Sequence, residues 1–306
     1  MGGVIMIDEM GGDFFQWLRG FFYVAKRGSV TLAAMEMGRN QPTVSHQVKC
    51  LENEFGIKLF DRSGGRMELT PEGRLMLEKA ISIFEIIKEM RDQTGGDLLQ
   101  RSGDVSICTT HAVIHYFLPS YVVNFRKQYR DVHFELRGGG VDMIMQKVES
   151  AEADFGIASL NSLPDNFAYY ELFETRPVLI APKGSRFFKK AVPSLEEISK
   201  APFIIFPESS TITPLIKETF KSNNLEMNIL FMLNNYETVK EFVALGTGIS
   251  ILDEYALNGK DDEKMDIYPL DSFFKPRKYG LLMRKKKYLS PCVKAFLRFL
   301  RPEVVL

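Results

Sequence analysis

Residues 31–51 read TLAAMEMGRNQPTVSHQVKCL and contain two short helical patterns separated by a polar turn. In the second pattern, the apolar residues Val44, Val48 and Leu51 recur at spacings of four and three, which is the period of one helix face. The turn (38–40) contains Gly and Asn, which tolerate the backbone conformations of a tight corner. Two helices joined by so short a turn predict a helix-turn-helix, whose second helix can enter the major groove of DNA.

Polar residues gather at the start of the second helical pattern. Pro42 suits a first helical turn, and the side chains around it would face base edges and phosphates. Further along, two short apolar segments flank Gly64-Gly65 and carry Arg62 and Arg66, which predicts a β-hairpin wing beside the groove. Each residue alone is an ordinary helix start or surface charge, whereas their ordered succession favours DNA binding. The candidate DNA-binding residues are Thr31, Asn40, Gln41, Pro42, Thr43, Ser45, His46, Lys49, Arg62 and Arg66.

The charge of this segment differs from that of the chain. Residues 18–74 carry a net charge of +3, whereas the 306 residues together hold 39 basic and 39 acidic side chains. A modest local excess of positive charge suits a dimer that brings two such segments onto one polyanion.

The segment from Leu18 to Leu75 also contains several short motifs. They are FFYVA at 21–25, GS at 28–29, AA at 33–34, QPTVS at 41–45, LE at 51–52, LFDR at 59–62 and LTPEG at 69–73. With these motifs the segment resembles the winged helix-turn-helix of LysR-type transcriptional regulators, which implies double-stranded promoter DNA as a partner. His46 stands where many members of that family carry a base such as Arg.

A long helical pattern follows, from Pro71 to Asp92, with an apolar seam of heptad spacing. Such a seam needs a partner, which could be the first helix of the same chain or the same helix of a second subunit. The resemblance implies the second arrangement, because LysR-type regulators dimerise through this linker helix. The candidate dimerisation residues are Met76, Ala80, Ile83, Ile87 and Met90.

Beyond Gly103, short apolar strands alternate with helical patterns, which predicts an α/β unit with mostly parallel sheets. Its length of about 200 residues suggests two subdomains with a ligand cleft between them. The fold class expected for the chain is an N-terminal winged helix-turn-helix, mostly α, then a long linker helix and a C-terminal α/β domain of two subdomains. The predicted domains are 12–72, 73–96 and 103–306, the last with subdomain I at about 103–162 and 271–306 and subdomain II at about 163–270.

Hydroxyl groups follow several of the predicted strands, close to helix starts. There they could bind an anionic ligand with help from the helix dipole, although simple N-capping explains each of them equally well. Three such clusters at equivalent corners favour a shared small-molecule cleft. The candidate effector-binding residues are Thr109, Thr110, His111, Ser159 and Thr211.

This half of the chain resembles the periplasmic-binding-protein-like effector domain of LysR-type regulators, through Leu118-Pro119, ADFGIA at 153–158 and FVALGTGI at 242–249. It is most similar to regulators of sulphur assimilation and cysteine synthesis, whose hydroxyls at the positions of Thr110, Ser159 and Thr211 hold a sulphate-like anion or an acyl-serine. Ala112 and Val113 depart from that pattern. A non-sulphur organic acid or an amino acid is therefore the alternative effector.

Other features limit the function classes. The three cysteines show no metal-ligand spacing, and His111 and His115, which are four residues apart, have no nearby Cys or carboxylate to complete a site, so we expect no metal and no cofactor. Neither a secretory signal nor a transmembrane run is present, so a cytoplasmic location without membrane contact is expected. Gly138-Gly139-Gly140 is interpreted as a tight turn and Lys285-Lys286-Lys287 as a solvated turn.

No enzyme motif is found, so the chain is not expected to be an enzyme. The leading hypothesis is a transcriptional regulator that responds to a small, anionic metabolite and self-associates as a dimer or tetramer. A cytoplasmic solute-binding receptor is the alternative class, which the cleft alone would permit.

Overall fold

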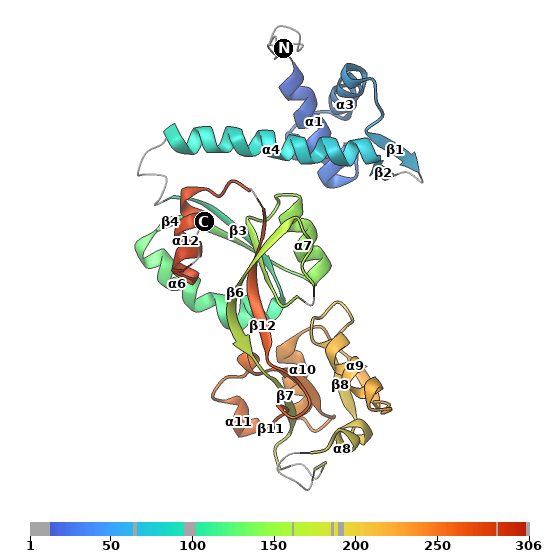
Figure 1. Ribbon diagram of the computed structural model, residues 1–306, viewed down its shortest axis with the longest axis vertical. Coiled ribbons are helices and arrows are strands. Elements are labelled where there is room, and N and C mark those ends of the chain that lie inside the picture. Colours follow the sequence, from blue (N-terminus) through green and yellow to red (C-terminus); the bar gives the residue numbers. More distant parts are fainter. Residues whose placement is uncertain are drawn as a thin grey trace. The chain divides into compact units, whose positions relative to one another are not determined.

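The computed structural model divides the chain into two compact units, residues 1–94 and 95–306, which are described separately (Figure 1). The residues that it describes are 13–63, 66–94, 102–160, 162–184, 187–188, 193–285 and 287–303. The expected domain start at residue 12, the turn Gly64-Gly65 and the expected end of the linker at residue 96 lie outside them. No helix in the described part of the chain is long and apolar enough to cross a membrane.

The first unit contains the predicted helix-turn-helix and wing. Its elements are α1 (Phe14–Arg27), α2 (Val30–Met37), α3 (Gln41–Phe55), the antiparallel strands β1 (Phe60–Ser63) and β2 (Arg66–Leu69), and the long helix α4 (Pro71–Thr94). One core, with Phe21, Val44 and Leu51 fully buried, joins the helices. The spacing seen in the sequence therefore corresponds to the buried face of α3.

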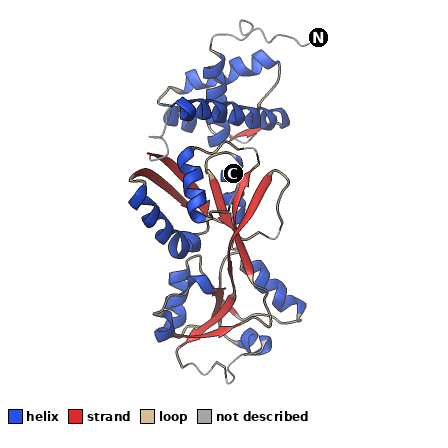
Figure 2. Cartoon of the chain, turned by 60° about the vertical axis from the view of Figure 1, so that its left-hand side comes forward, coloured by secondary structure: helices blue, strands red, loops and turns tan. Residues whose placement is uncertain are grey.

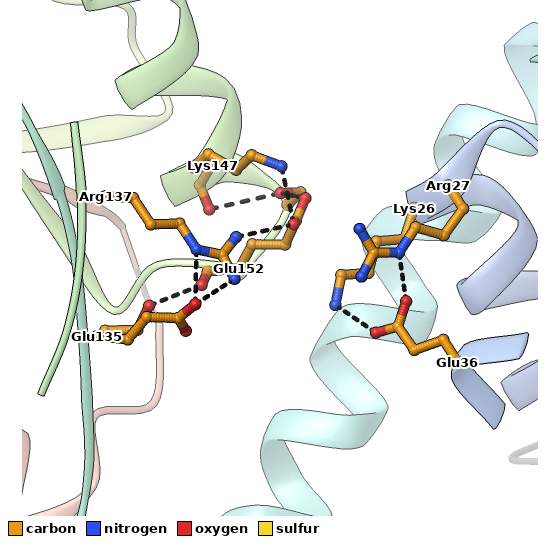
Figure 3. A network of polar contacts seen from close by, with 9 residues as sticks. Lys26, Arg27, Glu36, Glu135, Arg137, Lys147 and Glu152 are labelled. Carbon is orange, nitrogen blue, oxygen red and sulfur yellow. Dashed lines mark hydrogen bonds and ion pairs between the residues drawn. The ribbon is translucent and has the colours of Figure 1, made fainter. Parts of the chain in front are cut away.

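Local interactions set the corner between α2 and α3. Gly38 ends α2 with φ of 61°, a left-handed conformation that glycine adopts without steric cost. Asn40 caps α3, because its side chain accepts a hydrogen bond from the Thr43 N–H at 2.9 Å. Glu36 of α2 accepts hydrogen bonds from both Lys26 and Arg27 of α1 (Figure 3), which fastens the two helices at the surface.

The wing and the start of α4 are tightly joined. The Thr70 hydroxyl donates to the Lys58 carbonyl at 2.8 Å and accepts from the Gly73 N–H at 2.9 Å. A Cβ atom at Gly73 would lie 2.1 Å from the carbonyl oxygen of Leu59, so only glycine fits there. Arg74 adds a hydrogen bond to the Leu69 carbonyl at 2.9 Å.

The second unit has two lobes, each with its own core. Lobe I contains a five-stranded sheet in the order β4-β3-β5-β12-β6. Its strands are β3 (Ser102–Thr109), β4 (Asp131–Gly138), β5 (Phe155–Ala158), β6 (Phe167–Thr175) and β12 (Arg277–Arg284). Its helices are the π-helical turn η2 (Val113–Phe117), α6 (Leu118–Gln128), α7 (Val141–Glu149) and α12 (Pro291–Leu300).

Lobe II is built around a three-stranded sheet in the order β10-β7-β11 and a pair β8-β9 (Figure 2). An isolated bridge between Phe203 and Ile249 connects the two. Its strands are β7 (Pro177–Pro182), β8 (Phe203–Ile205), β9 (Ile229–Met232), β10 (Ser250–Asp253) and β11 (Met265–Pro269). Its helices are α8 (Leu195–Lys200), α9 (Thr213–Ser222), α10 (Tyr236–Ala244), η3 (Glu254–Ala256) and α11 (Asp261–Lys264).

The expectation of mostly parallel sheets is wrong. Among the strand pairs of the described residues, β3-β4, β3-β5 and β8-β9 are parallel, whereas β12 runs antiparallel to β5 and β6, and β7 antiparallel to β10 and β11. The chain leaves lobe I through β6 and returns through β12, so these adjacent strands must point in opposite directions. The hydrophobic periodicity of a sequence can indicate a strand but not the direction in which it runs. The strands β6 and β11 were not predicted from the sequence.

Two sets of polar contacts in lobe I were not predicted from the sequence. Lys287 is not solvated but almost fully buried, and its ammonium group donates to the carbonyls of Ala153 and Asp154 at 2.7 and 3.0 Å. Glu152 accepts hydrogen bonds from Lys147 at 2.8 Å and from Arg137 at 3.4 Å (Figure 3). Both contacts fasten the segment that leads from α7 into β5.

Candidate nucleic-acid interface and effector cleft

Helix α3 divides into a buried and an exposed face. With about 3.6 residues per turn, Pro42, Ser45 and Lys49 share one face and His46 lies beside them. Pro42, His46 and Lys49 are exposed, whereas Val44 and the residues four and seven positions further along are buried. Because these exposed residues cover no part of the core, they are available to a partner.

The other candidate DNA-binding residues surround this face. Gln41 and Thr31 are exposed at the starts of α3 and α2. The Thr43 hydroxyl donates to the Asn40 side chain at 2.6 Å, so Asn40 and Thr43 stiffen the helix start rather than remaining free. In the hairpin, Arg62 pairs with Met67 and Arg66 with Ser63.

One exposed residue of the same face was missed. Asn53 lies four residues after Lys49, and both line a cavity of about 390 Å³ with Ser45 and Lys58. Continuing the spacing of four from Ser45 and Lys49 would have found it in the sequence.

Only part of the predicted apolar seam of α4 is exposed to solvent. Ala80 is fully buried, and Met76 and Ile83 pack against the core of their own unit. This corrects the expectation for Ala80, because a side chain covered by its own chain cannot also contact a second subunit. Met90 is 61% exposed and Ile87 is half-buried. The sequence reading missed two further exposed apolar residues of α4, Leu75 and Ile86.

A cavity of about 170 Å³ lies between the two lobes of the second unit. Its described lining combines hydroxyl, amide, imidazole and glycine backbone groups with one phenylalanine and two tyrosine rings and contains no Lys, Arg, Asp or Glu. The lining residues are Thr110, His111, Ala112, Gly139, Gly140, Phe206, Pro207, Ser209, Ser210, Thr211, Asn234, Tyr236 and Tyr279.

The lobe I wall of this cavity contains the expected Thr110 and His111 but not Thr109. Thr109 is fully buried, and its hydroxyl donates to the Ile157 carbonyl at 2.6 Å. Its expected ligand contact is therefore corrected: this side chain points into the sheet. The Thr110 hydroxyl accepts from the Val113 N–H at 3.3 Å, which leaves its own proton available.

The lobe II wall contains Thr211, whose hydroxyl accepts a hydrogen bond from Arg277. The guanidinium of Arg277 also donates to the buried carboxylate of Asp253, and the Tyr279 hydroxyl donates to that carboxylate at 3.1 Å. Burial alone would lower the pKa of Arg277, but the negative charge of Asp253 raises it above its ordinary value. Burial raises the pKa of Tyr279 to about 12, so both groups stay protonated at neutral pH.

Ser159 and His111 take different places around the cleft. Ser159 does not line the central cavity but two neighbouring ones, of about 390 and 490 Å³, which it shares with Thr211. His111 lines the central cavity and another of about 450 Å³. Its ring packs so closely on Gly138 that a Cβ atom there would lie 2.3 Å from Nδ1.

The sequence reading missed several residues of this site. The rings of Phe206 and Tyr236 stack with centroids 4.4 Å apart and form an apolar wall. Gly140 lies across the cavity from Ser209, whose carbonyl oxygen would be 2.8 Å from a Cβ atom at that position. The glycine run therefore permits a close approach of the lobes. Within the described residues, no group of three potential ligands could hold a metal ion.

Comparison with known proteins places these features in a family. The family described as "Bacterial regulatory helix-turn-helix protein, lysR family" matches residues 15–74, and the "LysR substrate binding domain" matches residues 99–304. The transcriptional activator CmpR of Synechocystis is 28% identical over 92% of both chains, and the regulator CysB of Burkholderia cenocepacia is 24% identical over 92% of this chain and 90% of its own.

Solved structures support the same fold. A full-length OxyR variant from Pseudomonas aeruginosa superposes with a TM-score of 0.73 at 19% identity, covering 94% of this chain and 95% of the other. The cofactor-binding domain of the Cbl regulator gives 0.61 at 25% identity, covering 67% and 90%. The helix-turn-helix match and the regulators among the relatives exclude the solute-receptor and enzyme readings. The chain belongs to the LysR family of DNA-binding transcriptional regulators with an effector-binding domain.

Proposed function

We propose that this regulator binds promoter DNA as a self-associated assembly and responds to a small anionic metabolite held between the lobes of its second unit. The observation that carries the proposal is the cavity whose two walls each offer a Thr hydroxyl, Thr110 and Thr211. DNA binding also implies that the protein acts in the cytoplasm, where the chromosome lies.

The DNA contacts are proposed for the exposed face of α3 and for the wing. Lys49 would neutralise a phosphate, and His46 would donate to a phosphate or a base acceptor. Thr31, Gln41, Pro42 and Ser45 would lie against the groove edge, with Asn40 and Thr43 holding the helix start. Arg62 and Arg66 would contact phosphates beside the groove.

Gel-shift titration against the upstream region tests this interface. Lys49→Ala should weaken binding similarly on all sequences and reduce the slope of log affinity against log salt by about one. Lys88→Ala on α4 is the matched control, because it removes the same charge from an exposed position away from α3. Equal effects of the two substitutions would contradict the proposed groove contact.

Self-association is proposed through the exposed apolar residues of α4. Leu75, Ile86 and Met90 recur at spacings of eleven and four, so they share one helix face. Ile86→Glu should shift the protein toward monomer in sedimentation velocity, because a charge cannot be buried there without a partner. Lys88→Glu is the control, and an unchanged assembly in both variants would oppose this interface.

The effector is proposed to contact Thr110, His111 and Thr211, with Ser159 at the neighbouring cavities. The first N–H groups of a helix have no intrahelical partner and attract anions, and the helical run that leads into η2 and α6 begins at His111. A sulphur metabolite related to sulphate or an acyl-serine is the finer proposal, and a non-sulphur organic acid or an amino acid is the alternative.

A thermal-shift screen of the full chain tests the ligand class. Selective binding to the folded protein raises the unfolding midpoint. Sulphate, thiosulphate, O-acetylserine, benzoate and glutamate should be compared with the same panel on a Thr110→Val, Thr211→Val double variant. A midpoint shift that survives the double substitution would place the ligand elsewhere.

A further inference from the structure

The buried pair Asp253–Arg277 lies directly behind the cleft wall. Arg277 begins β12 and Asp253 ends β10, and their side chains are 7% and 0% exposed. One guanidinium nitrogen donates to Asp253 and the other to the Thr211 hydroxyl oxygen. This arrangement uses the planar fork of arginine, which offers several donors and no acceptor.

The donor from Arg277 determines what Thr211 can offer a ligand. A hydroxyl has one proton, and because Arg277 occupies the oxygen as a donor, the proton of Thr211 points elsewhere. Within the described residues its hydrogen-bonding neighbour is the Tyr279 hydroxyl, at 3.5 Å, whose own proton is donated to Asp253. That separation is too long for a good O–H···O hydrogen bond, so an acceptor atom of a ligand would replace it favourably.

The positive charge of Arg277 is set back from the central cavity, although its side chain lines the neighbouring cavity of about 490 Å³. Asp253 balances this charge within the protein, and the central cavity has no Lys or Arg among its described lining residues. Recognition at Thr211 then depends on the direction of a proton rather than on a net positive charge. Arg277 occupies one of the two lone pairs of the Thr211 oxygen, so a ligand O–H could donate only to the second, and the Thr211 proton would then lack that ligand group as its acceptor.

We propose that Arg277, held by Asp253, is the specificity-determining residue of the cleft: it fixes Thr211 as a hydrogen-bond donor, so that the cavity selects acceptor-only oxyanions or carboxylates over isosteres that carry an O–H. This inference rests on the proposed function of the cleft. Arg277 acts through Thr211 and is a positioning residue for the ligand.

Methanesulfonate and methylphosphonate provide a matched pair of probes. In mildly acidic buffer each carries one negative charge and nearly the same shape, but only methylphosphonate carries an O–H. The full-length protein should bind methanesulfonate about fivefold more tightly, because every oxygen of this probe can accept the Thr211 proton whereas one oxygen of methylphosphonate carries a proton of its own. Competition or direct titration by calorimetry gives both dissociation constants.

Three variants separate the role of Arg277 from general damage. Asp253→Asn with Arg277→Met removes both charges together, so that no unpaired buried charge remains. Arg277→Lys keeps the charge but loses the fork, and Thr211→Ser keeps the hydroxyl. The preference should fall to about twofold or less in the first two and persist in Thr211→Ser. Lys278→Gln, an exposed neighbour, is the control.

The outcomes are distinct. A wild-type protein that binds both probes equally overturns the assignment of Arg277, and so does a preference that persists in folded Arg277→Lys. If the double variant does not fold, Arg277→Lys alone decides. A wild-type protein that binds neither probe contradicts the proposed function of the cleft itself.

Discussion

Two corners of the effector-binding unit each contain a pair of threonines and orient them by different means. In lobe I, Thr109 is buried and bonds to the Ile157 carbonyl while Thr110 lines the cavity. In lobe II, Thr213 is buried and bonds to the Phe206 carbonyl at 2.8 Å while Thr211 lines the cavity. Each corner thus has one hydroxyl that closes the fold and one that faces the ligand site.

The corners differ in what orients the exposed hydroxyl. Thr110 is oriented by a backbone N–H of its own helix, three residues away. Thr211 is oriented by Arg277, 66 residues away in the sequence, and through it by Asp253. Similar sequence patterns therefore correspond to one hydroxyl oriented by a local contact and one oriented by a long-range contact. Variants at these positions should distinguish the two.

The largest expected effect concerns the long-range corner. Arg277→Ala leaves the carboxylate of Asp253 buried without its cation, which should lower the free energy of unfolding by about 3–5 kcal/mol. Removing the exposed neighbour in Lys278→Ala should cost far less, because water screens its ion pair with Glu171. Denaturant titration of both variants measures the difference in unfolding free energy. Comparable losses in the two variants would mean that the Asp253–Arg277 pair does not stabilise this corner.

Next in size are the two buried hydroxyls. Thr109→Val and Thr213→Val each remove a buried hydrogen bond and should lower the free energy of unfolding by about 1–3 kcal/mol. Neither should change ligand affinity in the folded protein, because neither side chain lines the cavity. Chemical denaturation and calorimetric titration together test this, and a specific loss of affinity would show that the two roles in a corner are not separate.

Removing the exposed hydroxyls should instead weaken ligand binding, with a smaller change in free energy. Thr211→Val should weaken binding of an acceptor ligand about tenfold, the effect of about 1.4 kcal/mol. Thr110→Val should weaken it about threefold, because the N–H groups at the helix start remain as donors. Equal losses in calorimetric titration would argue that local and long-range orientation have the same effect.

The last effect appears only at alkaline pH and is absent under neutral conditions. Burial raises the pKa of Tyr279 and of Tyr169 to about 12 each, against about 10 for an unfolded tyrosine. The unfolded chain thus loses these protons first, so their contribution to stability is complete below about pH 10 and is lost toward pH 12. Unfolding free energies across that range, with tyrosinate absorbance as the readout, should decline less in Tyr279→Phe.

Sequence alone was sufficient where structure is local. The helix-turn-helix follows from the spacing of Val44, Val48 and Leu51, and these residues are buried as the period requires. The antiparallel return of β12 left no such signal, because strand direction does not change local periodicity, and the five residues of η2 are too few to reveal a π-helical period.

The effector site was predictable only in part for the same reason. The hydroxyl clusters revealed Thr110 and Thr211, but Thr109 and Thr110 differ only in which side of a strand end they occupy. Arg277 and Asp253 belong to strands that are far from Thr211 in sequence, and only packing brings them together.

The junction of wing and linker helix has a mechanical consequence. Thr70 and Gly73 bond the hairpin to the first turn of α4 with no room for even one added carbon. A rotation of α4 about its own axis therefore moves the hairpin with it. The orientation of the wing is thus coupled to the rotation of α4.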